Sequence, residues 1–398
     1  MRTAYAAPAL PLLPAYGVRS LGELLPSIAA ALAPEGEALR GPLGLAPVRR
    51  AVVLLIDGLG WQLLADNVDI APTLAAAMVE PPLTSAFPST TATSLATLGT
   101  GLPPGSHGVT GLMVRVPGTS TVMNSLTWEN GLDPRVWQPW PTVFEQLLAD
   151  GVAVTRVGPA PFEGSGLTEA TLRGGDYVAV DSVGQRAAAI VAGLERGERA
   201  LVYAYHRDLD HTGHLSGCGS LAWREELALV DAAVARIVAL LPADAALWVT
   251  GDHGMVDVSA EDCIDLADEP ALSAGVSYLA GEPRARHLHV REGAAEDVLH
   301  AWAGRLGDRA WVCSRAQAVA QGWFGAVEPR VVERIGDVVV AARESLSLVD
   351  RRVDPPGLLT LIGHHGSLTP AEVEVPLLHW RADAVLRAGR RQYRGGRR

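Results

Sequence analysis

The stretch Val48–Gly58, with the sequence VRRAVVLLIDG, decides the fold of this 398-residue chain. Its continuous run of apolar, largely β-branched residues is typical of a parallel strand that is buried on both faces. Asp57 follows the last apolar residue, and Gly58 permits the turn out of the strand. An aspartate at this place is usually a turn former or a helix cap. Ligands, however, gather at the carboxyl ends of strands in open α/β sheets, so Asp57 is also a candidate site residue.

Similar strand patterns recur along the chain and are separated by helical patterns. The further strands are expected at 152–158, 200–205 and 246–250, and the helices at 142–148, 187–194 and 225–241. Strands that alternate with amphipathic helices indicate βαβ units. We therefore predict an α/β fold with a doubly wound, mostly parallel central sheet.

The remaining segments suggest how the chain is divided. Residues 1–47 are rich in Pro, Ala and Leu and are expected to wrap the surface of a main domain formed by 48–256 plus 355–389. The pattern changes over 257–354, where we predict a small inserted α+β subdomain. The Arg-rich end, 390–398, is predicted to be a disordered tail.

Composition excludes several kinds of protein. The net charge of −11 argues against binding of a nucleic-acid polymer. Three widely spaced cysteines, Cys218, Cys263 and Cys313, form neither a disulfide framework nor a thiolate zinc motif. The N-terminus is a poor signal peptide, and no uninterrupted apolar run reaches the length of a membrane span. We expect a cytoplasmic protein without a membrane partner.

A second stretch, Phe87–Gly108, reads FPSTTATSLATLGTGLPPGSHG and places a hydroxyl cluster before a run that can form a short helix. A hydroxyl residue is a preferred N-cap, and the free N–H groups of the first helical turn attract anions such as phosphate. Alone, the stretch would be a plain capping motif. Beside the clusters of Asp and His described next, Thr90 or Thr91 becomes a candidate to carry a nucleophilic oxygen.

Asp and His residues fall at the ends of expected strands. They are Asp57, Asp210 with His214, Asp252 with His253, and His365. Each motif alone is more often a turn, and His107, His287 and His379 are expected to be structural, with His364 a solvated neighbour. Together, mixed Asp and His ligands without cysteine suit zinc or a similar divalent ion at a catalytic site. With Thr91 as a shared oxygen ligand the set suffices for two metals.

The order of these motifs resembles that of the alkaline phosphatase superfamily, and within it the type I phosphodiesterase and nucleotide pyrophosphatase branch. The resemblance covers roughly residues 50–378 and includes Thr100-Gly101 at the family's offset from Thr91. It implies an alkaline phosphatase-like fold and two divalent metal ions. We expect Zn²⁺, and Mn²⁺ is the alternative. One metal would be surrounded by Asp57, Thr91, Asp252 and His253, and the other held by Asp210, His214 and His365. Thr91 would be the nucleophile, with Thr90 as the alternative.

The sequence departs from the family near the nucleophile. The family places a phosphate-binding Asn where this chain has Leu112. Asn124 or Arg115 is therefore a candidate to contact the substrate phosphoryl group. Trp128, Trp137 and Trp140 either shape a leaving-group pocket or belong to the core.

These observations together predict a metal-dependent hydrolase that cleaves phosphodiester or phosphoanhydride bonds through a threonine nucleophile. The expected substrate is a small-molecule phosphoester or a nucleotide-like compound. A phosphomonoesterase or a phosphonate hydrolase of the same superfamily is the first alternative. A non-catalytic, metal-bound scaffold is the second, and the oligomeric state stays open.

Overall fold

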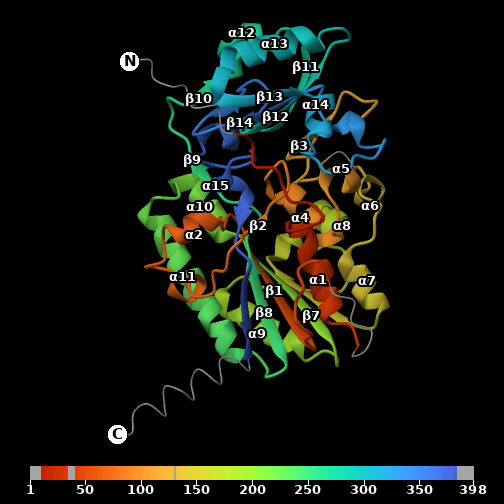
Figure 1. Cartoon of the computed structure of the whole chain (residues 1–398), viewed down its shortest axis with the longest axis vertical. Helices are drawn as coiled ribbons and strands as arrows, with labels where there is room; N and C mark the ends of the chain where they lie inside the picture. The colour runs from red at the N-terminus through yellow and green to blue at the C-terminus, as the bar shows by residue number, and fades with distance from the viewer. Residues whose placement is uncertain (1–9, 35–40, 130, 383–398) are drawn as a thin grey trace.

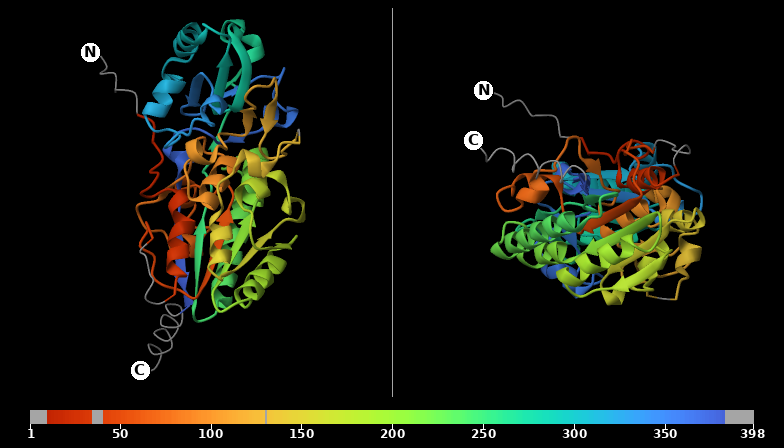
Figure 2. Two further views of the ribbon diagram at one scale, coloured as in Figure 1. Left: turned by 90° about the vertical axis from the view of Figure 1, so that its right-hand side faces the viewer. Right: turned by 90° about the horizontal axis from the view of Figure 1, so that it is seen from below.

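The computed structural model describes residues 10–34, 41–129 and 131–382, so the expected tail at 390–398 lies outside the described residues. Two six-stranded sheets organise these residues. Figure 1 shows the larger part of the molecule, with β1, β7 and β8, below a smaller part that carries β11–β14. The left view of Figure 2 shows the two parts stacked along the long axis.

The central sheet has the order β18-β8-β1-β7-β5-β6. Its strands are β1 (Arg50–Ile56), β5 (Ala153–Gly158), β6 (Asp176–Ala179), β7 (Ala200–His206), β8 (Ala245–Thr250) and β18 (Leu378–Arg381). All neighbours pair in parallel except β18, which runs antiparallel to β8. The prediction of a mostly parallel central sheet is confirmed, and β1 lies inside it, as expected from its continuous apolar run.

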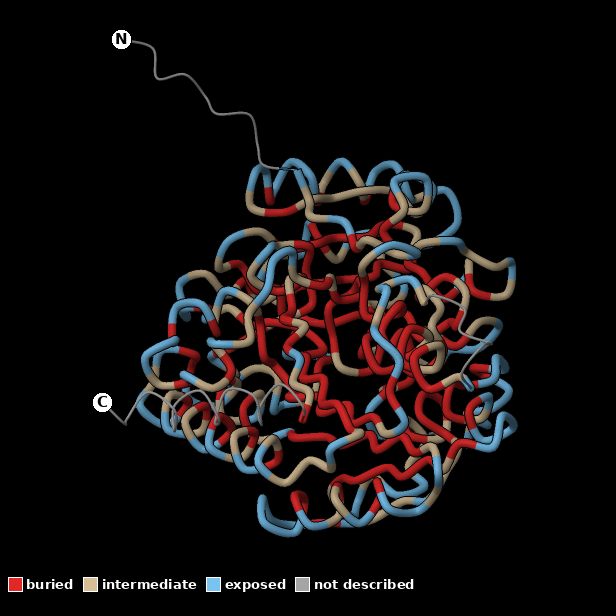
Figure 3. Tube along the Cα trace, turned by 60° about the horizontal axis from the view of Figure 1, so that its bottom comes forward, coloured by how far each residue is buried: buried red, intermediate tan, exposed pale blue. Residues whose placement is uncertain are grey.

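Helices cover both faces of this sheet because the side chains of β1 alternate between two cores. Val52, Leu54 and Ile56 belong to the core that contains α9 (Val183–Leu194) and α11 (Leu221–Leu240). The intervening β1 residues pack in a second core with helices from the first half of the chain. These are α1 (Leu24–Ala31), α4 (Thr91–Thr100) and α7 (Val143–Ala149). Figure 3 shows the buried strands enclosed by helices with exposed outer faces.

The N-terminal segment contributes to the core. The Ser20 hydroxyl and the Glu23 carboxylate form a capping box at the short 3₁₀ helix η1 (Leu21–Glu23), which leads into α1. Leu21, Leu24 and Ile28 are fully buried against the central sheet. The segment expected to wrap the surface therefore supplies a core helix over this part of its length.

Helix boundaries follow local capping. Thr142 and Glu145 form a capping box that starts α7 close to the expected position. Ser220 accepts from the Trp223 N–H and starts α11 at Leu221, four residues before the expected start at 225. The prediction missed this first turn of α11 because it was based only on the periodicity of apolar residues.

The smaller sheet is antiparallel and has the order β13-β14-β12-β11-β3-β4. Its strands are β3 (Met113–Arg115), β4 (Val122–Asn124), β11 (Val276–Glu282), β12 (Ala285–Val290), β13 (Ala310–Ser314) and β14 (Val338–Ala342). Helix α13 (Ala295–Leu306) packs on it through Val298, Trp302 and Leu306. The β3–β4 hairpin lies outside the range 257–354 expected for the insertion, so this sheet joins two distant parts of the chain.

Two buried ion pairs fix the end of the smaller sheet nearest the central domain. Arg284 binds Glu372 in a bidentate pair, with Nε–Oε1 and Nη2–Oε2 distances of 2.7 and 2.8 Å. Both side chains are fully buried. Arg286 pairs with Asp354, with 3.0 Å between Nη1 and Oδ1. Each of these charged side chains is thus paired with an opposite charge in good hydrogen-bond geometry. Burial of a charge is tolerated only when it is paired in this way.

Short elements complete the described chain. The helices are α2 (Trp61–Ala65), α3 (Pro72–Ala75), α5 (Pro104–His107), α6 (Pro134–Trp137), α8 (Gly166–Thr171), α10 (Asp208–Ser216), α12 (Pro270–Ser273), α14 (Arg315–Ala320) and α15 (Pro370–Val373). The two-stranded pairs are β10 (Cys263–Asp265) with β15 (Ser347–Val349), β16 (Gly363–His364) with β9 (Val256–Asp257), and β17 (Glu374–Val375) with β2 (Leu83–Thr84). Among the described residues, no helix combines the length and the apolar character needed to cross a membrane.

Candidate active site

Helix α4 places Thr91 in its first turn. Thr90 is the N-cap residue in extended conformation, but its side chain makes no capping hydrogen bond. The expected hydroxyl cap is therefore not formed, and no side chain of the N-cap occupies the first N–H groups of this ten-residue helix. The N-terminus of such a helix is an electrostatically favourable place for an anion.

Thr91 lies beside the first group of candidate ligands. Its Oγ1 is 3.3 Å from Nε2 of His253. The same Nε2 lies 3.3 Å from Asp57 Oδ1 and 3.6 Å from Asp252 Oδ2. Asp57 follows β1 and Asp252 follows β8, and these strands are parallel neighbours. The sheet therefore brings the two carboxylates together at the carboxyl ends of its strands.

Asp210, His214 and His365 form the second group. Asp210 and His214 lie on α10, so they share a helix face at an i,i+4 spacing, where a turn was expected. His214 Nε2 is 3.3 Å from Asp210 Oδ2, and His365 Nε2 is 3.9 Å from Asp210 Oδ1. The rings of His253 and His365 stack with 3.5 Å between centroids. The structure thus brings Thr91 and all six proposed Asp and His ligands to one place.

The histidines of both groups are oriented by backbone carbonyls. The Nδ1 atoms of His214, His253 and His365 lie 2.7, 2.9 and 2.8 Å from the carbonyl oxygens of Gly363, Gly254 and Ser89. A carbonyl oxygen only accepts, so each Nδ1 carries a proton and each Nε2 is the ring nitrogen that faces the carboxylates and is available to a metal ion. Metal-binding histidines are held in this way.

The carboxylates of both groups also have oxygens that are open to a metal ion. Asp57 Oδ1, Asp210 Oδ1 and Asp252 Oδ2 are buried without a hydrogen-bond partner among the described residues. Burial, followed by repulsion from Asp252 and Asp210, raises the pKa of Asp57 well above its ordinary value. Bound cations would compensate this unpaired negative charge. The donor set of carboxylate oxygens and imidazole nitrogens therefore fits one or more divalent metal ions.

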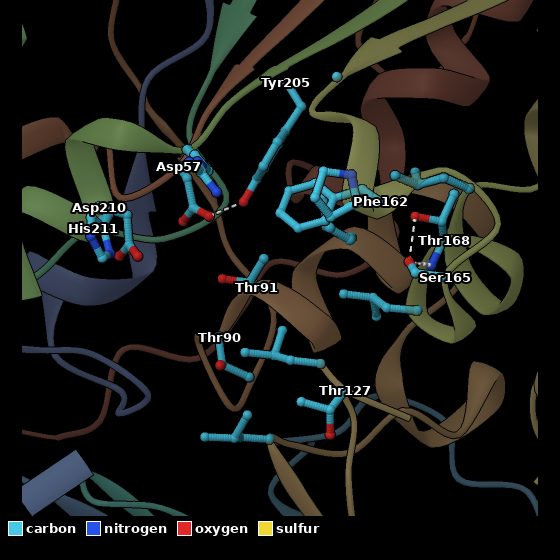
Figure 4. Close-up of a pocket in the computed structure, with 18 of the residues that line it drawn as sticks. Asp57, Thr90, Thr91, Thr127, Phe162, Ser165, Thr168, Tyr205, Asp210 and His211 are labelled. Atoms are coloured by element: carbon cyan, nitrogen blue, oxygen red, sulfur yellow. Dashed lines mark hydrogen bonds between the residues drawn. The ribbon is translucent and has the colours of Figure 1, made fainter. Parts of the chain in front are cut away.

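A cavity of about 610 Å³ opens beside Thr91. Figure 4 shows Thr91 between Asp57, Asp210 and His211 on one side and Phe162, Ser165 and Thr168 on the other. The wall away from the carboxylates is mainly apolar and includes Leu95, Leu126, Phe162, Leu167, Leu172 and Tyr177. The cavity is much larger than a single phosphoryl group requires, so it has room for an organic substituent.

The other expected substrate contacts lie outside this cavity. The Asn124 side chain accepts from the Leu126 N–H at 2.9 Å and so stabilises the turn after β4. The Arg115 guanidinium lies 4.7 Å from the centre of the Tyr278 ring. Neither Asn124 nor Arg115 is among the residues that line the cavity. Their binding roles stay predictions.

None of the three tryptophans lines the cavity either. Trp128 and Trp137 are buried, and the Arg334 guanidinium lies 3.6 Å from the Trp137 ring centre. Trp140 is 42% exposed and lies outside the apolar wall. A core role fits the first two.

His107 and His364 lie outside the two groups of candidate ligands. His107 is buried, with Nε2 3.0 Å from Thr97 Oγ1, in agreement with a structural role. His364, expected to be solvated, is instead buried, and its Nε2 contacts the Leu361 carbonyl oxygen at 3.1 Å. Burial of β16 between α10 and β9 explains the difference. All three cysteines are free thiols.

Sequence reasoning missed several residues of the site. Tyr205 donates from its hydroxyl to Asp57 Oδ2 and so leaves Oδ1 of that carboxylate open. Arg156 and Arg207 line the cavity, and so does Glu282 from the end of β11. The position of Tyr205, beside the end of a predicted strand, was the available signal. Nothing local marked Glu282, because it belongs to the segment expected to form a separate insertion.

The fold and the site define the class of protein: an α/β enzyme whose candidate metal-assisted centre lies at the carboxyl edge of a parallel sheet. A family model for the type I phosphodiesterases / nucleotide pyrophosphatases matches residues 51–368. The chain therefore belongs to this family and is a phosphoric ester hydrolase. Family members depend on divalent metals.

Solved structures agree on the fold. Murine ectonucleotide pyrophosphatase/phosphodiesterase 5 superposes with a TM-score of 0.68 and 20% identity, over 84% of this chain and 89% of that chain. An inactive variant of the murine protein in complex with AMP matches equally well, with a TM-score of 0.68, 20% identity and 84% and 90% coverage. Phosphonoacetate hydrolase from Sinorhizobium meliloti 1021, in complex with phosphonoformate, follows with a TM-score of 0.63, 19% identity and 84% and 90% coverage. A comparison with curated proteins gave no match.

Proposed function

We propose that this chain hydrolyses phosphodiester or phosphoanhydride bonds of small molecules, with Thr91 as the nucleophile and two divalent cations as cofactors. The observation that carries the proposal is the position of Thr91 Oγ1, 3.3 Å from His253 Nε2 and beside carboxylates that each keep one buried oxygen without a hydrogen-bond partner among the described residues. Thr90 is the weaker candidate because its hydroxyl contacts Glu282 and not this cluster. A non-catalytic scaffold would have no use for a threonine at this place.

The chain's own residues account for the proposed course of the reaction. Thr91 Oγ1 would attack phosphorus with loss of its hydroxyl proton, the bond from phosphorus to the leaving oxygen would break, and that oxygen would leave with a proton. The threonine-linked intermediate would keep the other substituent of the phosphorus. Water would then attack the same phosphorus, the bond to Oγ1 would break, and a proton from the water would restore the Thr91 hydroxyl. Asp57, Asp252 and His253 would hold one cation, and Asp210, His214 and His365 the other. Divalent cations supply Lewis-acid chemistry, which lowers the pKa of the threonine hydroxyl and offsets charge on the phosphoryl oxygens.

The charge and size of the cavity favour a diester over a monoester. Among the residues that line it, Arg156 and Arg207 are the arginines. Arg156 donates to the carbonyls of Leu172 and Gly175, and Arg207 to Asp208. Each guanidinium is thus partly occupied by contacts within the chain, and the lining contains no other arginine. The apolar wall instead provides a place for the second substituent of a diester.

The test compares Thr91→Ala and Thr90→Ala with wild type on bis(p-nitrophenyl) phosphate. We expect Thr91→Ala to abolish turnover while bound metal, measured by elemental analysis, changes little. Thr90→Ala should keep a measurable rate. Abolition by Thr90→Ala alone would assign the nucleophile to the other threonine. Full activity of Thr91→Ala would contradict covalent catalysis by this residue.

A substrate panel tests the alternative chemistries. Phosphonoacetate hydrolase shares the fold, so the panel pairs mono- and di-p-nitrophenyl phosphate with a phosphonate and a nucleotide diphosphate. We expect the diester or the anhydride to be turned over fastest. Metal-depleted protein should recover activity best with Zn²⁺, and Mn²⁺ should be the next best cation. The cytoplasmic location stays a prediction from the sequence.

A further inference from the structure

A third acidic side chain, after Asp57 and Asp210, lines the cavity and comes from the smaller sheet. Glu282 is the last residue of β11, is 3% exposed and lines the cavity together with Thr90 and Thr91. It belongs to neither candidate metal group. The segment that carries it, 257–354, was expected to cover one side of the site, but no residue of it was expected to line the cavity.

The two oxygens of the Glu282 carboxyl group have different environments. Oε2 accepts a hydrogen bond of 3.0 Å from the Leu112 N–H. Oε1 is buried and has no hydrogen-bond partner among the described residues. A buried carboxyl oxygen without a partner costs free energy unless a ligand completes it. The carboxyl group is therefore anchored at one oxygen and open at the other.

One glycine makes room for this side chain. A Cβ atom at Gly366 would lie 2.8 Å from Glu282 Cγ, closer than side-chain carbons approach, and 3.5 Å from Oε1. Gly366 directly follows the candidate ligand His365 and also bonds Ser89, one residue before the N-cap of α4. The Glu282 carboxyl is thus built into the junction of the nucleophile helix and the ligand loop.

Burial, and not the surrounding charges, favours the protonated form of Glu282. Burial is the largest cause and raises the pKa of Glu282 to about 8. Arg286 opposes this shift and Glu372 supports it, but each of them is already paired, with Asp354 and Arg284. The hydrogen bonds from Leu112 and Thr90 also oppose it without outweighing burial. Since Oε2 accepts from a backbone N–H, Oε1 is the oxygen that is available to carry the proton of the acid form.

We propose that the Glu282 carboxyl group, in its acid form, donates a hydrogen bond from Oε1 to a non-bridging oxygen of the substrate phosphoryl group. This assignment rests on the proposed function, because it needs the phosphoryl group beside Thr91. Phosphoryl oxygens only accept hydrogen bonds, so a carboxyl group that faces them must carry its proton. Glu282 would then fix the phosphoryl group beside Thr91.

Two substitutions distinguish donation by the acid from other roles. Glu282→Gln keeps the acceptor for the Leu112 N–H and replaces the O–H donor by an amide N–H. Glu282→Ala removes both. We expect Glu282→Ala to lower kcat/KM for bis(p-nitrophenyl) phosphate by roughly tenfold to 100-fold, the effect of one hydrogen bond to a charged group. Glu282→Gln should stay within about threefold of wild type. Glu328→Gln, outside the cavity, is the matched control.

A binding measurement separates this inference from the proposed reaction. Inorganic phosphate is titrated into metal-loaded wild type, Glu282→Gln and Glu282→Ala by calorimetry between pH 6 and pH 9.5. Wild type should lose affinity as the pH rises through about 8, and Glu282→Gln should not show this loss. The result can hold even if no phosphodiester is hydrolysed, in which case only the proposed function fails.

Three outcomes would overturn the inference. Unchanged kinetics and phosphate affinity in Glu282→Ala would show that the carboxyl group does not contact the ligand. Equal losses in Glu282→Gln and Glu282→Ala, with unfolding temperatures near wild type, would show that the ionised carboxylate is what matters. An alkaline loss of phosphate affinity that persists in Glu282→Gln would assign that titration to another group.

Discussion

The protein buries acidic groups in two regions and treats them in opposite ways. At the end of the smaller sheet, Glu372 is held by a bidentate bond to Arg284. At the carboxyl edge of the central sheet, Asp57 and Asp252 are just as buried, yet each keeps an oxygen without a partner. The first arrangement satisfies every charge within the chain. The second leaves charge to be satisfied by something that binds, which is how a structural ion pair differs from a candidate active site.

The largest effect should come from the unsatisfied region. Asp252→Asn removes one negative charge from the Asp57, Asp252 and His253 group. We expect turnover and metal affinity to fall at least about 100-fold, because even indirect partners of metal ligands cost tenfold to 100-fold. Metal binding is measured by competition with a chromogenic chelator. Near-normal metal affinity in Asp252→Asn would contradict the claim that the carboxylates of this region, unlike Glu372, are left open to bind a cation.

Breaking the satisfied region should affect stability instead. Arg284→Met leaves Glu372 buried without its partner, and such losses cost about 3–5 kcal/mol of unfolding free energy. The exposed pair of Arg351 with Asp268 is the control, and Arg351→Ala should cost less than about 1 kcal/mol. Both are measured by urea unfolding, with turnover per folded molecule expected to change little. A fall in turnover of the folded fraction would show that the ion pair also supports the site.

The pH dependence of stability sharpens the comparison further. The pKa of Asp57 is raised from an ordinary value of 3.8, so above pH 3.8 this carboxyl group binds a proton more fully in the folded, metal-free protein than in the unfolded chain. Its unfolding free energy should therefore fall as the pH rises from about 4 through the folded-state pKa. Asp57→Asn should flatten this slope, whereas Asp297→Asn on the exposed face of α13 should not. A slope that is unchanged in Asp57→Asn would contradict the proposed repulsion among the carboxylates.

The smallest effects are expected at the edge of the smaller sheet. Asn124→Ala and Arg115→Ala alter residues that do not line the cavity, so KM for bis(p-nitrophenyl) phosphate should change by less than about twofold. Steady-state kinetics measures this directly. A rise in KM of tenfold or more would support the phosphate-binding roles expected from the sequence.

The sequence predicted the parts of this protein that depend on local pattern. The apolar run before Asp57 identified the central strand, and the motifs at the strand ends identified the ligands that the structure brings together. Such patterns do not show which residues far apart in the sequence lie side by side in the fold. Nothing near Glu282 indicates that β11 ends beside the nucleophile helix, because the Leu112 N–H that it binds is 170 positions away. Asn124 and Arg115 were chosen as candidate phosphate contacts because they lie near the nucleophile in the sequence. In the β3–β4 hairpin, Asn124 instead binds the Leu126 N–H and Arg115 lies over the Tyr278 ring.

The β3–β4 hairpin has a consequence for engineering. After α4 and α5 the chain enters the smaller sheet, where Met113 pairs with Gly281 of β11. Deleting 257–354 to obtain a minimal enzyme would remove β11, the strand that pairs with β3. The unpaired edge of β3 would then be exposed and prone to aggregation. Circular permutation, which preserves every pairing, is the more promising route to a remodelled variant.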